Sequence, residues 1–489
     1  MRSLIKARSF IIWIIISSVF VTTASFAGQN EQAESWRKQA PQPHSARPFD
    51  LPTAREVKLE NGLTLVMIED HRTPLVTMNA GVSQAMSGND LMSQVALAEA
   101  TGELLTEGAG SRTSEQLARE VETLGGQISS SASSDYAVVN AAVISENAEA
   151  MIGVLADVLA RPAFHSSEVA LYKNNRIENL TVDRQNPAFL VREHFNRVIY
   201  GSHPYGIVAP TPETIRLMTR AKIARFYESS YSPAASVVVI VGDFDSTKME
   251  AKAVATLGKW KKPIASATKP IASATPGPAV RRVLLIDRPG SEQADFRIGN
   301  LAVAHSDADY FPLMVANAVL GGERTGSRLF MNIREQKGYT YDVYSAVSAL
   351  KRGGTFFGGS ATRTEVTIPA IKEMLAEFDR LRNEAVPAEE LQNAKSYLTG
   401  AFSISLSTQG GIADEILQIR LLGLGADYLK NYRARIEAVT ASDVQRVARK
   451  YILTDRPIIV VVGDAAKLRK ELSTLGPITA LNVKGSPRK

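Results

Sequence analysis

The chain has 489 residues, more than a single hydrophobic core serves, so we expect at least two domains. It contains no cysteine, which excludes a disulfide scaffold and cysteine-based zinc or redox sites. Its formal net charge of +6 comes from charges of mixed sign without a long basic run. A nucleic-acid-binding function therefore has no support in the composition.

The N-terminus follows the three-part pattern of a secretory signal peptide. A basic segment ending at Arg8 precedes the apolar run 10–21, and small residues stand before a cleavage point after Ala27. The run is shorter than the roughly 20 residues of a membrane span, although a retained anchor is the alternative. We predict a signal over residues 1–27, export to the periplasm and no membrane contact after cleavage. The polar residues 28–52 are expected to form a flexible leader.

Strands and long helices are mixed after the leader. Asn61-Gly62 predicts the turn of a hairpin, and Thr113 with Gln116 predicts a capping box. Apolar spacing and turn residues then predict further elements. The expected elements are a hairpin at 56–69, a helix between Thr113 and Gly125, strands at 127–133 and 136–144, and a helix at 148–159.

A linker is predicted in the middle of the chain. The heptapeptide Lys-Pro-Ile-Ala-Ser-Ala-Thr occurs at residues 262–268 and again at 269–275, and Pro-Gly-Pro follows. A tract of proline, alanine and serine does not build a core. We therefore expect a linker over residues 262–280.

The two sides of this linker resemble each other. Each ends in an amphipathic helix with a tyrosine, a proline-containing turn and an apolar strand that leads into Gly-Asp. Tyr231 pairs with Tyr451, and Gly242 pairs with Gly463, at nearly the same offset. This offset indicates a duplicated domain, not a short-period repeat. The predicted fold is α+β, with two homologous domains, each a mixed or antiparallel sheet packed with long helices. Their limits are 53–261 and 281–482, with a tail at 483–489.

Residues 97–113 read LAEATGELLTEGAGSRT. This segment resembles the metal-site helix of the pitrilysin-type (M16) zinc peptidases and the glycine-containing turn after it. The Asn-Gly-Leu hairpin, a Leu-Gly-Gly turn and the His-Pro-Tyr-Gly stretch at 203–206 extend the resemblance over most of the chain. Without that context, an ordinary buried helix is the alternative interpretation.

The family has His-x-x-Glu-His within this helix, where the present chain has Ala100, Glu103 and Leu104. The resemblance implies that Glu103 matches the family's general base and Glu178 its carboxylate ligand. Zinc requires converging imidazole, thiolate or carboxylate donors, which alanine and leucine lack. No two of the six histidines are three to five residues apart, so no helical histidine pair exists. We expect a degenerate zinc site and no metal on this chain. A solvated helix carboxylate is the alternative for Glu178.

A second block resembles the same family in the C-terminal half. Residues 320–341 read LGGERTGSRLFMNIREQKGYTY. Arg334 and Tyr341 match the arginine and tyrosine that the family places over its zinc site, with Tyr339 and Tyr344 as nearby phenols. A guanidinium and a phenol donate hydrogen bonds to an oxyanion or to a peptide backbone. The glycine-rich segment 351–362 is read either as an edge that pairs with a substrate peptide or as a twisted strand.

Smaller members of the family pair two chains around a chamber, and in some pairs one subunit supplies the zinc motif and the other the arginine and tyrosine. The resemblance therefore implies a non-zinc subunit of an exported heterodimeric metallopeptidase that hydrolyses peptides and is inactive alone. Zinc is expected on a homologous partner subunit. The alternative is a non-catalytic scaffold that binds peptides or supports assembly, and a lone enzyme with an unusual metal site ranks last.

Overall fold

A computed structural model describes residues 53–84, 90–261, 272–274, 281–323, 325–425 and 427–487. The predicted signal peptide, the leader and most of the predicted linker lie outside the described residues, so these predictions remain open. Within the described ranges, none of the helices combines the length and the apolar character that crossing a membrane requires.

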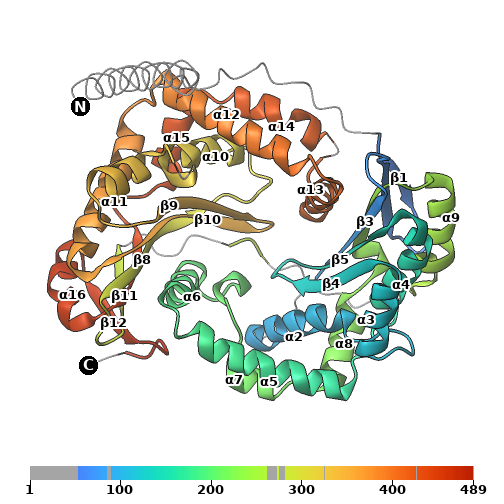
Figure 1. The fold of residues 1–489 in the computed structure, drawn as a ribbon. Helices are drawn as coiled ribbons and strands as arrows, with labels where there is room; N and C mark the ends of the chain where they lie inside the picture. The colour runs from blue at the N-terminus through green and yellow to red at the C-terminus, as the bar shows by residue number, and fades with distance from the viewer. Residues whose placement is uncertain are drawn as a thin grey trace, which may run out of the picture. The chain divides into compact units, whose positions relative to one another are not determined.

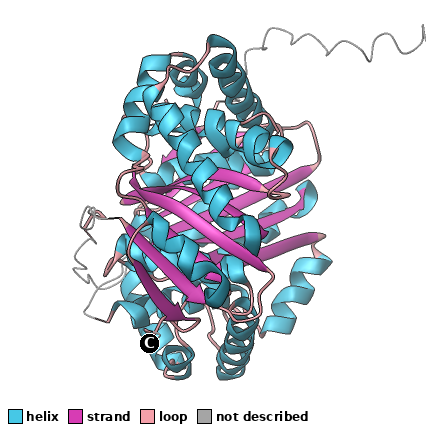
Figure 2. Cartoon of the chain, turned by 90° about the vertical axis from the view of Figure 1, so that its left-hand side faces the viewer, coloured by secondary structure: helices cyan, strands magenta, loops and turns pink. Residues whose placement is uncertain are grey.

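The strands form two six-stranded mixed sheets, one from each half of the chain (Figure 1). The first sheet has the spatial order β1 (Arg55–Lys58), β2 (Thr64–Glu69), β6 (Ser236–Gly242), β3 (Leu75–Ser83), β5 (Tyr136–Ile144), β4 (Gly126–Ala132). The second has the order β12 (Ile478–Asn482), β7 (Arg282–Asp287), β11 (Ile458–Gly463), β8 (Gln293–Ala302), β10 (Gly353–Arg363), β9 (Val343–Leu350). Helices pack around the strands, as Figure 2 shows. The α+β prediction is confirmed.

Five strands of each sheet repeat the same order and direction. β6 lies between β2, which is parallel to it, and β3, which is antiparallel. β11 lies in the same way between β7 and β8. β6 ends at Gly242 and β11 ends at Gly463, the two glycines that the sequence comparison paired. The topology thus confirms the duplication, while the residue limits of the two domains stay a prediction.

One interpretation of the glycine-rich segment is wrong. β10, which contains most of that segment, pairs with β8 on one side and with β9 on the other. Because both of its edges are already hydrogen-bonded, it cannot accept a peptide as an additional strand. The alternative, a strand with turns, fits the structure: residues 351–352 form a turn, β10 follows as an interior strand, and β9 forms the edge of the sheet.

The helices of the first half follow one another along the chain as α2 (Leu91–Glu103), α3 (Ser114–Thr123), α4 (Ala148–Ala160), α5 (Ser166–Asp183), α6 (Pro187–Tyr200), α7 (Pro212–Arg216), α8 (Arg220–Ser230), α9 (Ser246–Thr256). Those of the second half are α10 (Tyr310–Asn317), α11 (Thr367–Asn383), α12 (Ala388–Ser405), α13 (Gln409–Leu422), α14 (Tyr428–Glu437), α15 (Ala441–Tyr451), α16 (Ala465–Leu472). Two π-helical turns, Ala318–Gly322 and Phe330–Gln336, follow α10.

Local signals in the first half act as the sequence predicts. The Thr113 hydroxyl accepts a hydrogen bond from the Gln116 N–H at 3.2 Å, and the Gln116 side chain accepts from the Thr113 N–H at 3.0 Å. This capping box satisfies two N–H groups that the first turn of α3 leaves unpaired. Gly125 ends the segment with a φ of +67°, a conformation that glycine adopts without steric cost.

The duplicated halves exchange one helix. α6, from the first half, packs on β8 and β11 of the second sheet, and α13, from the second half, packs on β3 and β6 of the first. Phe195 of α6 meets Phe357 of β10 edge to face, with ring centroids 5.7 Å apart. The Asn79 side chain of β3 donates to the Asp414 carboxylate of α13 at 2.6 Å. Each sheet is therefore covered in part by a helix of the other half.

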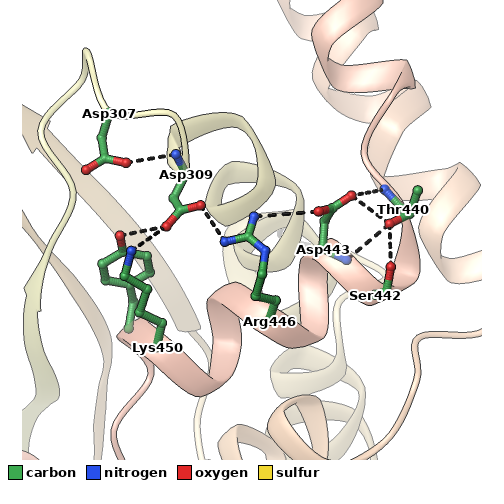
Figure 3. A network of polar contacts seen from close by, with 8 residues as sticks. Asp307, Asp309, Thr440, Ser442, Asp443, Arg446 and Lys450 are labelled. Carbon is green, nitrogen blue, oxygen red and sulfur yellow. Dashed lines mark hydrogen bonds and ion pairs between the residues drawn. The ribbon is translucent and has the colours of Figure 1, made fainter.

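A polar network attaches α10 to α15 (Figure 3). Asp309, immediately before α10, accepts hydrogen bonds from Arg446 at 2.5 Å, from Lys450 at 2.8 Å and from the Tyr451 hydroxyl at 2.8 Å. Burial acts to raise the pKa of Asp309, but these three donors outweigh it and lower the pKa to about 2. Asp309 therefore holds two helices together as a charged group.

Candidate functional site

Helix α2 carries the positions that the resemblance assigns to a zinc motif. The Asp90 carboxylate caps the helix by accepting a hydrogen bond from the Ser93 N–H at 3.1 Å. Ala100 is 0% exposed and Leu104 is 1% exposed, and both belong to the hydrophobic core of the first half. α2 ends at Glu103, and Leu104 begins a short 3-10 turn. The two positions that would carry imidazoles thus serve packing.

The end of α2 lies directly against strand β4. A Cβ atom added at Gly102 would stand 2.5 Å from the Cβ of Ala132, closer than two such atoms approach. The Ser130 hydroxyl donates to the Glu103 carbonyl at 3.2 Å and also bonds to the Thr106 hydroxyl at 3.0 Å. This segment therefore has a fixed and closely packed position on the sheet.

The carboxylates around α2 share a guanidinium. Arg176 of α5 forms an ion pair with Glu99 of α2, and the two side chains are 18% and 17% exposed. Burial raises the pKa of Glu99, and Arg176 opposes that shift. Glu103 is exposed at the helix end, but the protein atoms around its carboxylate raise its pKa by desolvation, and the charge of Glu99 adds to the effect. One cation of the chain thus already compensates these acidic groups.

Glu178 does not join this cluster. Its side chain is exposed on α5, and no hydrogen bond or ion pair joins it to another described residue. The arrangement fits the alternative interpretation, a solvated helix carboxylate.

The residues at this site do not fit zinc. The metal requires three or four nitrogen, oxygen or sulfur donors that converge on one point. Ala100 and Leu104 supply none, and Arg176 holds the charge of Glu99. Over the described residues, no group of three or more histidine, aspartate and glutamate side chains is arranged to hold a metal ion. His203 caps a short 3-10 turn by accepting from the Tyr205 N–H at 3.2 Å, as a turn residue does.

Arg334 lies in the second π-helical turn of the C-terminal half. Its guanidinium carbon stands 4.7 Å from the centre of the Phe330 ring, and its Nη1 donates to the neighbouring Glu335 carboxylate. The side chain is 38% exposed. An exposed ion pair contributes about 0–1 kcal/mol, so a competing anionic group can replace Glu335 at little cost.

Tyr341 is 93% exposed, the most exposed of the large hydrophobic side chains in the described residues. The residue before it is anchored, because the Thr340 hydroxyl donates to the Ala361 carbonyl of β10 at 2.7 Å. Tyr339 packs against the core of the second half, and the ring of Tyr344 lies 6.1 Å from that of Phe357. Tyr341 is therefore the phenol of this segment that is open to another molecule.

No polar contact among the described residues connects the two predicted sites within this chain. Among the described residues, neither Arg334 nor Tyr341 has a hydrogen bond or an ion pair with Glu103 or Glu178, and none joins Arg334 to Tyr341. Sequence reasoning also missed the Glu99–Arg176 pair. The sequence feature that could have predicted this pair is the arginine two residues before Glu178. The sequence does not show which face of α5 turns toward α2.

Family profiles match two consecutive parts of the chain. Residues 101–212 match "Insulinase (Peptidase family M16)", and residues 218–398 match "Peptidase M16 inactive domain". The two matches together cover more than half of the 489 residues.

The chain is similar to curated proteins named uncharacterized zinc proteases. It is 28% identical to one of Streptomyces coelicolor over 364 residues, 74% of this chain and 79% of the relative. It is 26% identical to one of Bacillus subtilis over 359 residues, 72% of this chain and 85% of the relative.

Solved structures share the fold. The crystal structure of a peptidase M16 inactive domain from Pseudomonas fluorescens matches with a TM-score of 0.76 and 24% identity, covering 84% of this chain and 98% of that one. A protease from Helicobacter pylori matches with a TM-score of 0.79 and 19% identity, covering 85% of this chain and 100% of that one. At these identities the likeness extends to the architecture alone.

Proposed function

This chain belongs to the M16 peptidase family, and we propose that it is the non-zinc subunit of an exported heterodimeric zinc metallopeptidase. It contributes Arg334 and Tyr341 to a site whose zinc is bound by a homologous partner subunit. Its substrates are peptides. On its own the chain is inactive.

The contrast between the two predicted sites carries this proposal. Ala100 and Leu104 lie in the hydrophobic core and offer no donor atom to a metal. Arg334 and Tyr341, in contrast, lie on the surface, and Tyr341 is almost completely exposed. The Tyr341 ring is thus free to contact another molecule, and the residue before it is fixed to strand β10 by the Thr340 hydroxyl. The proposal assigns these two residues to a substrate held between the subunits.

Arg334 and Tyr341 have a chemical role in amide hydrolysis. Attack of water on a peptide carbonyl places negative charge on the carbonyl oxygen. The guanidinium is permanently charged, and the phenol is a neutral donor. Donors aimed at that oxygen stabilise the transition state more than the neutral substrate, which is the requirement for catalysis. Arg334 would exchange its contact with Glu335 for the substrate oxygen.

The second candidate function is a non-catalytic scaffold that binds peptides or supports an assembly. The closely packed helix α2 favours the scaffold function, because a protein that only binds peptides needs no metal ligands at this position. In this case Arg334 and Tyr341 would be incidental surface residues. The two candidates differ in whether any partner yields peptide hydrolysis.

The test combines this chain with a homologous chain of similar size that has an intact His-x-x-Glu-His. Each chain alone and the mixture are assayed with quenched fluorescent peptides, with and without a chelator. We expect hydrolysis by the mixture, loss of activity with the chelator, and no hydrolysis by this chain alone. Cleavage by the isolated chain that a chelator abolishes would contradict the non-zinc assignment. If no such partner yields hydrolysis, the non-catalytic scaffold is the candidate function that remains.

Variants of the active pair test the two residues. Arg334→Ala is expected to lower kcat/KM about 100- to 1000-fold, the effect of losing one oxyanion donor. Tyr341→Phe removes only the hydroxyl and is expected to act mainly on kcat. Lys337→Ala and Tyr339→Phe are matched controls in the same segment, and both should retain activity. Size-exclusion chromatography confirms that each pair still forms. Unchanged turnover in both test variants would contradict the proposed roles of Arg334 and Tyr341.

A further inference from the structure

A second site lies between α10, α12, α13 and α14. A cavity of about 360 Å³ opens there, within the usual size range of small-ligand sites. Six aromatic side chains contribute to its wall: His305, Tyr310, Tyr397, Phe402, Tyr428 and Tyr432. The cavity is distinct from the Arg334–Tyr341 segment, and no residue of that segment lines it.

Small residues and an irregular helix make room for this cavity. α10 continues into the π-helical turn Ala318–Gly322, which is wider than an α-helical turn. Ala318 and Gly322 of this turn and Ala401 of α12 face the cavity. π-Turns inside α-helices occur frequently at functional sites, so the local geometry favours a binding role.

The aromatic wall is preformed. The rings of Phe402 and Tyr432 stack with centroids 3.8 Å apart and an angle of 15° between their planes. His305 lies 4.0 Å from the ring centre of Tyr310, and its Nε2 is 3.2 Å from the Tyr428 hydroxyl. These contacts hold the side chains in place without a ligand, which lowers the entropic cost of binding.

One carboxylate in the wall lacks a counter-ion. Glu415 of α13 accepts a hydrogen bond from the Ser405 hydroxyl at 3.2 Å. No lysine or arginine among the described residues pairs with it, and none lines the cavity. Burial raises the pKa of Glu415, and burial followed by the charge of Glu415 raises the pKa of Tyr432 to about 12. The carboxylate is thus desolvated next to the aromatic rings.

The neighbouring histidine does not supply the missing charge. Burial lowers the pKa of His305 to about 4, so its imidazole is neutral at neutral pH. A partly buried carboxylate without a cation is unfavourable, and aromatic ring faces carry negative electrostatic potential. Arg435 of α14 lies 6.0 Å from the centre of the Tyr428 ring, but it does not line the cavity. One positively charged ligand inside the cavity would interact favourably with both the Glu415 carboxylate and the aromatic rings.

We propose that this cavity binds an organic cation of the alkylammonium class, with its nitrogen among the aromatic rings and beside Glu415. Quaternary and alkylated ammonium groups are recognised by such aromatic cages. The cation is either a free small solute or the basic side chain of a polypeptide, and the chemistry is the same for both. This proposal does not depend on the peptidase function.

The test measures binding to the purified chain by isothermal titration calorimetry. Choline is compared with 3,3-dimethylbutan-1-ol, which has the same shape without the charge. We expect choline to bind at least about tenfold more tightly. N-acetyl-lysine methylamide, compared with its norleucine analogue, tests the polypeptide source. Tighter binding of the lysine compound indicates a basic side chain, and tighter binding of choline indicates a free solute.

Three variants locate the binding site. Glu415→Gln should weaken choline binding about tenfold, because it removes the charge and keeps the shape. Phe402→Leu should weaken choline binding and leave the alcohol almost unchanged, because it removes a ring and keeps apolar volume. Glu437→Gln, an exposed carboxylate on α14 outside the cavity, is the matched control. Melting curves check the fold of each variant. Equal binding of choline and the alcohol, no binding of any ammonium compound, or full binding by folded Glu415→Gln would overturn the proposal.

Discussion

The two halves of the chain use equivalent pairs of helices in opposite ways. In the first half, α2 lies so close to β4 that Gly102 leaves no space for a Cβ atom, and α2 and α5 are joined by the Glu99–Arg176 pair. In the second half, α10 follows β8 as α2 follows β3, and α12 is the second helix after β10 as α5 is after β5. α10 and α12 contact each other and help to line a cavity, together with Glu415 of α13, which pairs with no lysine or arginine of the described residues. The carboxylate beside the first pair of helices thus has a cation, while the one beside the second pair does not.

The two halves share a topology but differ in the chemistry of the side chains around these helices. The two sheets share five strands in the same order, so the duplicated fold alone does not determine where a ligand binds. Three local features differ: a glycine at the contact with the sheet, an arginine opposite the acidic residues, and a π-helical turn. Substitutions at the arginine and the glycine, and at Asp309 and Gly400 in the second half, test this comparison.

The largest effect is expected when Arg176 is replaced by methionine. Glu99 then remains buried without its cation, and removal of one partner of such a pair costs about 3–5 kcal/mol of stability. Because burial already raises the pKa of Glu99, loss of Arg176 raises it further. The cost is therefore full above that pKa and shrinks as the pH falls and the carboxylate takes up a proton.

Urea unfolding at about pH 8 and about pH 5 measures this difference, since an unfolded glutamate titrates near pH 4.3. The double variant Glu99→Gln/Arg176→Met is the control and should recover most of the stability. A loss that does not depend on pH would show that Arg176 acts through packing and not through its charge.

Asp309 provides the next largest effect. Its pKa of about 2 lies below the unfolded value, so its contribution is present above about pH 4 and is lost as the pH falls toward 2. We expect Asp309→Asn to cost about 2 kcal/mol at neutral pH and almost nothing near pH 2. Its counterpart Asp90 is exposed and only caps α2, where asparagine caps equally well. Asp90→Asn should therefore leave the urea midpoint nearly unchanged, and an equal loss in both variants would contradict the comparison.

Gly102→Ala tests the close contact of α2 with β4. The added methyl group meets the Cβ of Ala132 at 2.5 Å, and overpacking of this kind costs about 1–3 kcal/mol even though alanine favours a helix. Thermal unfolding measures the loss. The double variant Gly102→Ala/Ala132→Gly should restore much of it by removing the opposing methyl group. A stable single variant would mean that α2 can move away from the sheet.

Gly400→Ala in α12 should give the smallest effect, with the opposite sign. A Cβ atom there enters open space, and alanine in an exposed helix interior is favoured over glycine by about 0.5–1 kcal/mol. A rise in the melting temperature is expected. A fall would show that the exposed face of α12 is not free in solution.

Much of the architecture follows from local sequence signals. The Asn-Gly turn, the capping box at Thr113 and the paired Gly242 and Gly463 each depend on chemistry within a few residues, and each lies where the sequence predicts. The Glu99–Arg176 pair and the cavity beside Glu415 depend on contacts between distant helices. Periodicity indicates which face of a helix is apolar, but it does not identify the helix that faces it. The roles of Arg334 and Tyr341 remain predictions, since they require a second chain.

The exchanged helices have a consequence for how the protein reaches its folded state. The contact between Asn79 and Asp414 joins residues that are 335 positions apart. α13 is made after nearly the whole chain, so the first sheet emerges from the ribosome with the apolar face that α13 covers still uncovered. Contacts of such long range form slowly, and open sheet faces are prone to aggregation in the meantime. A chain that ends before α13 is therefore expected to depend on chaperones or to precipitate, even though it contains every strand of its first sheet.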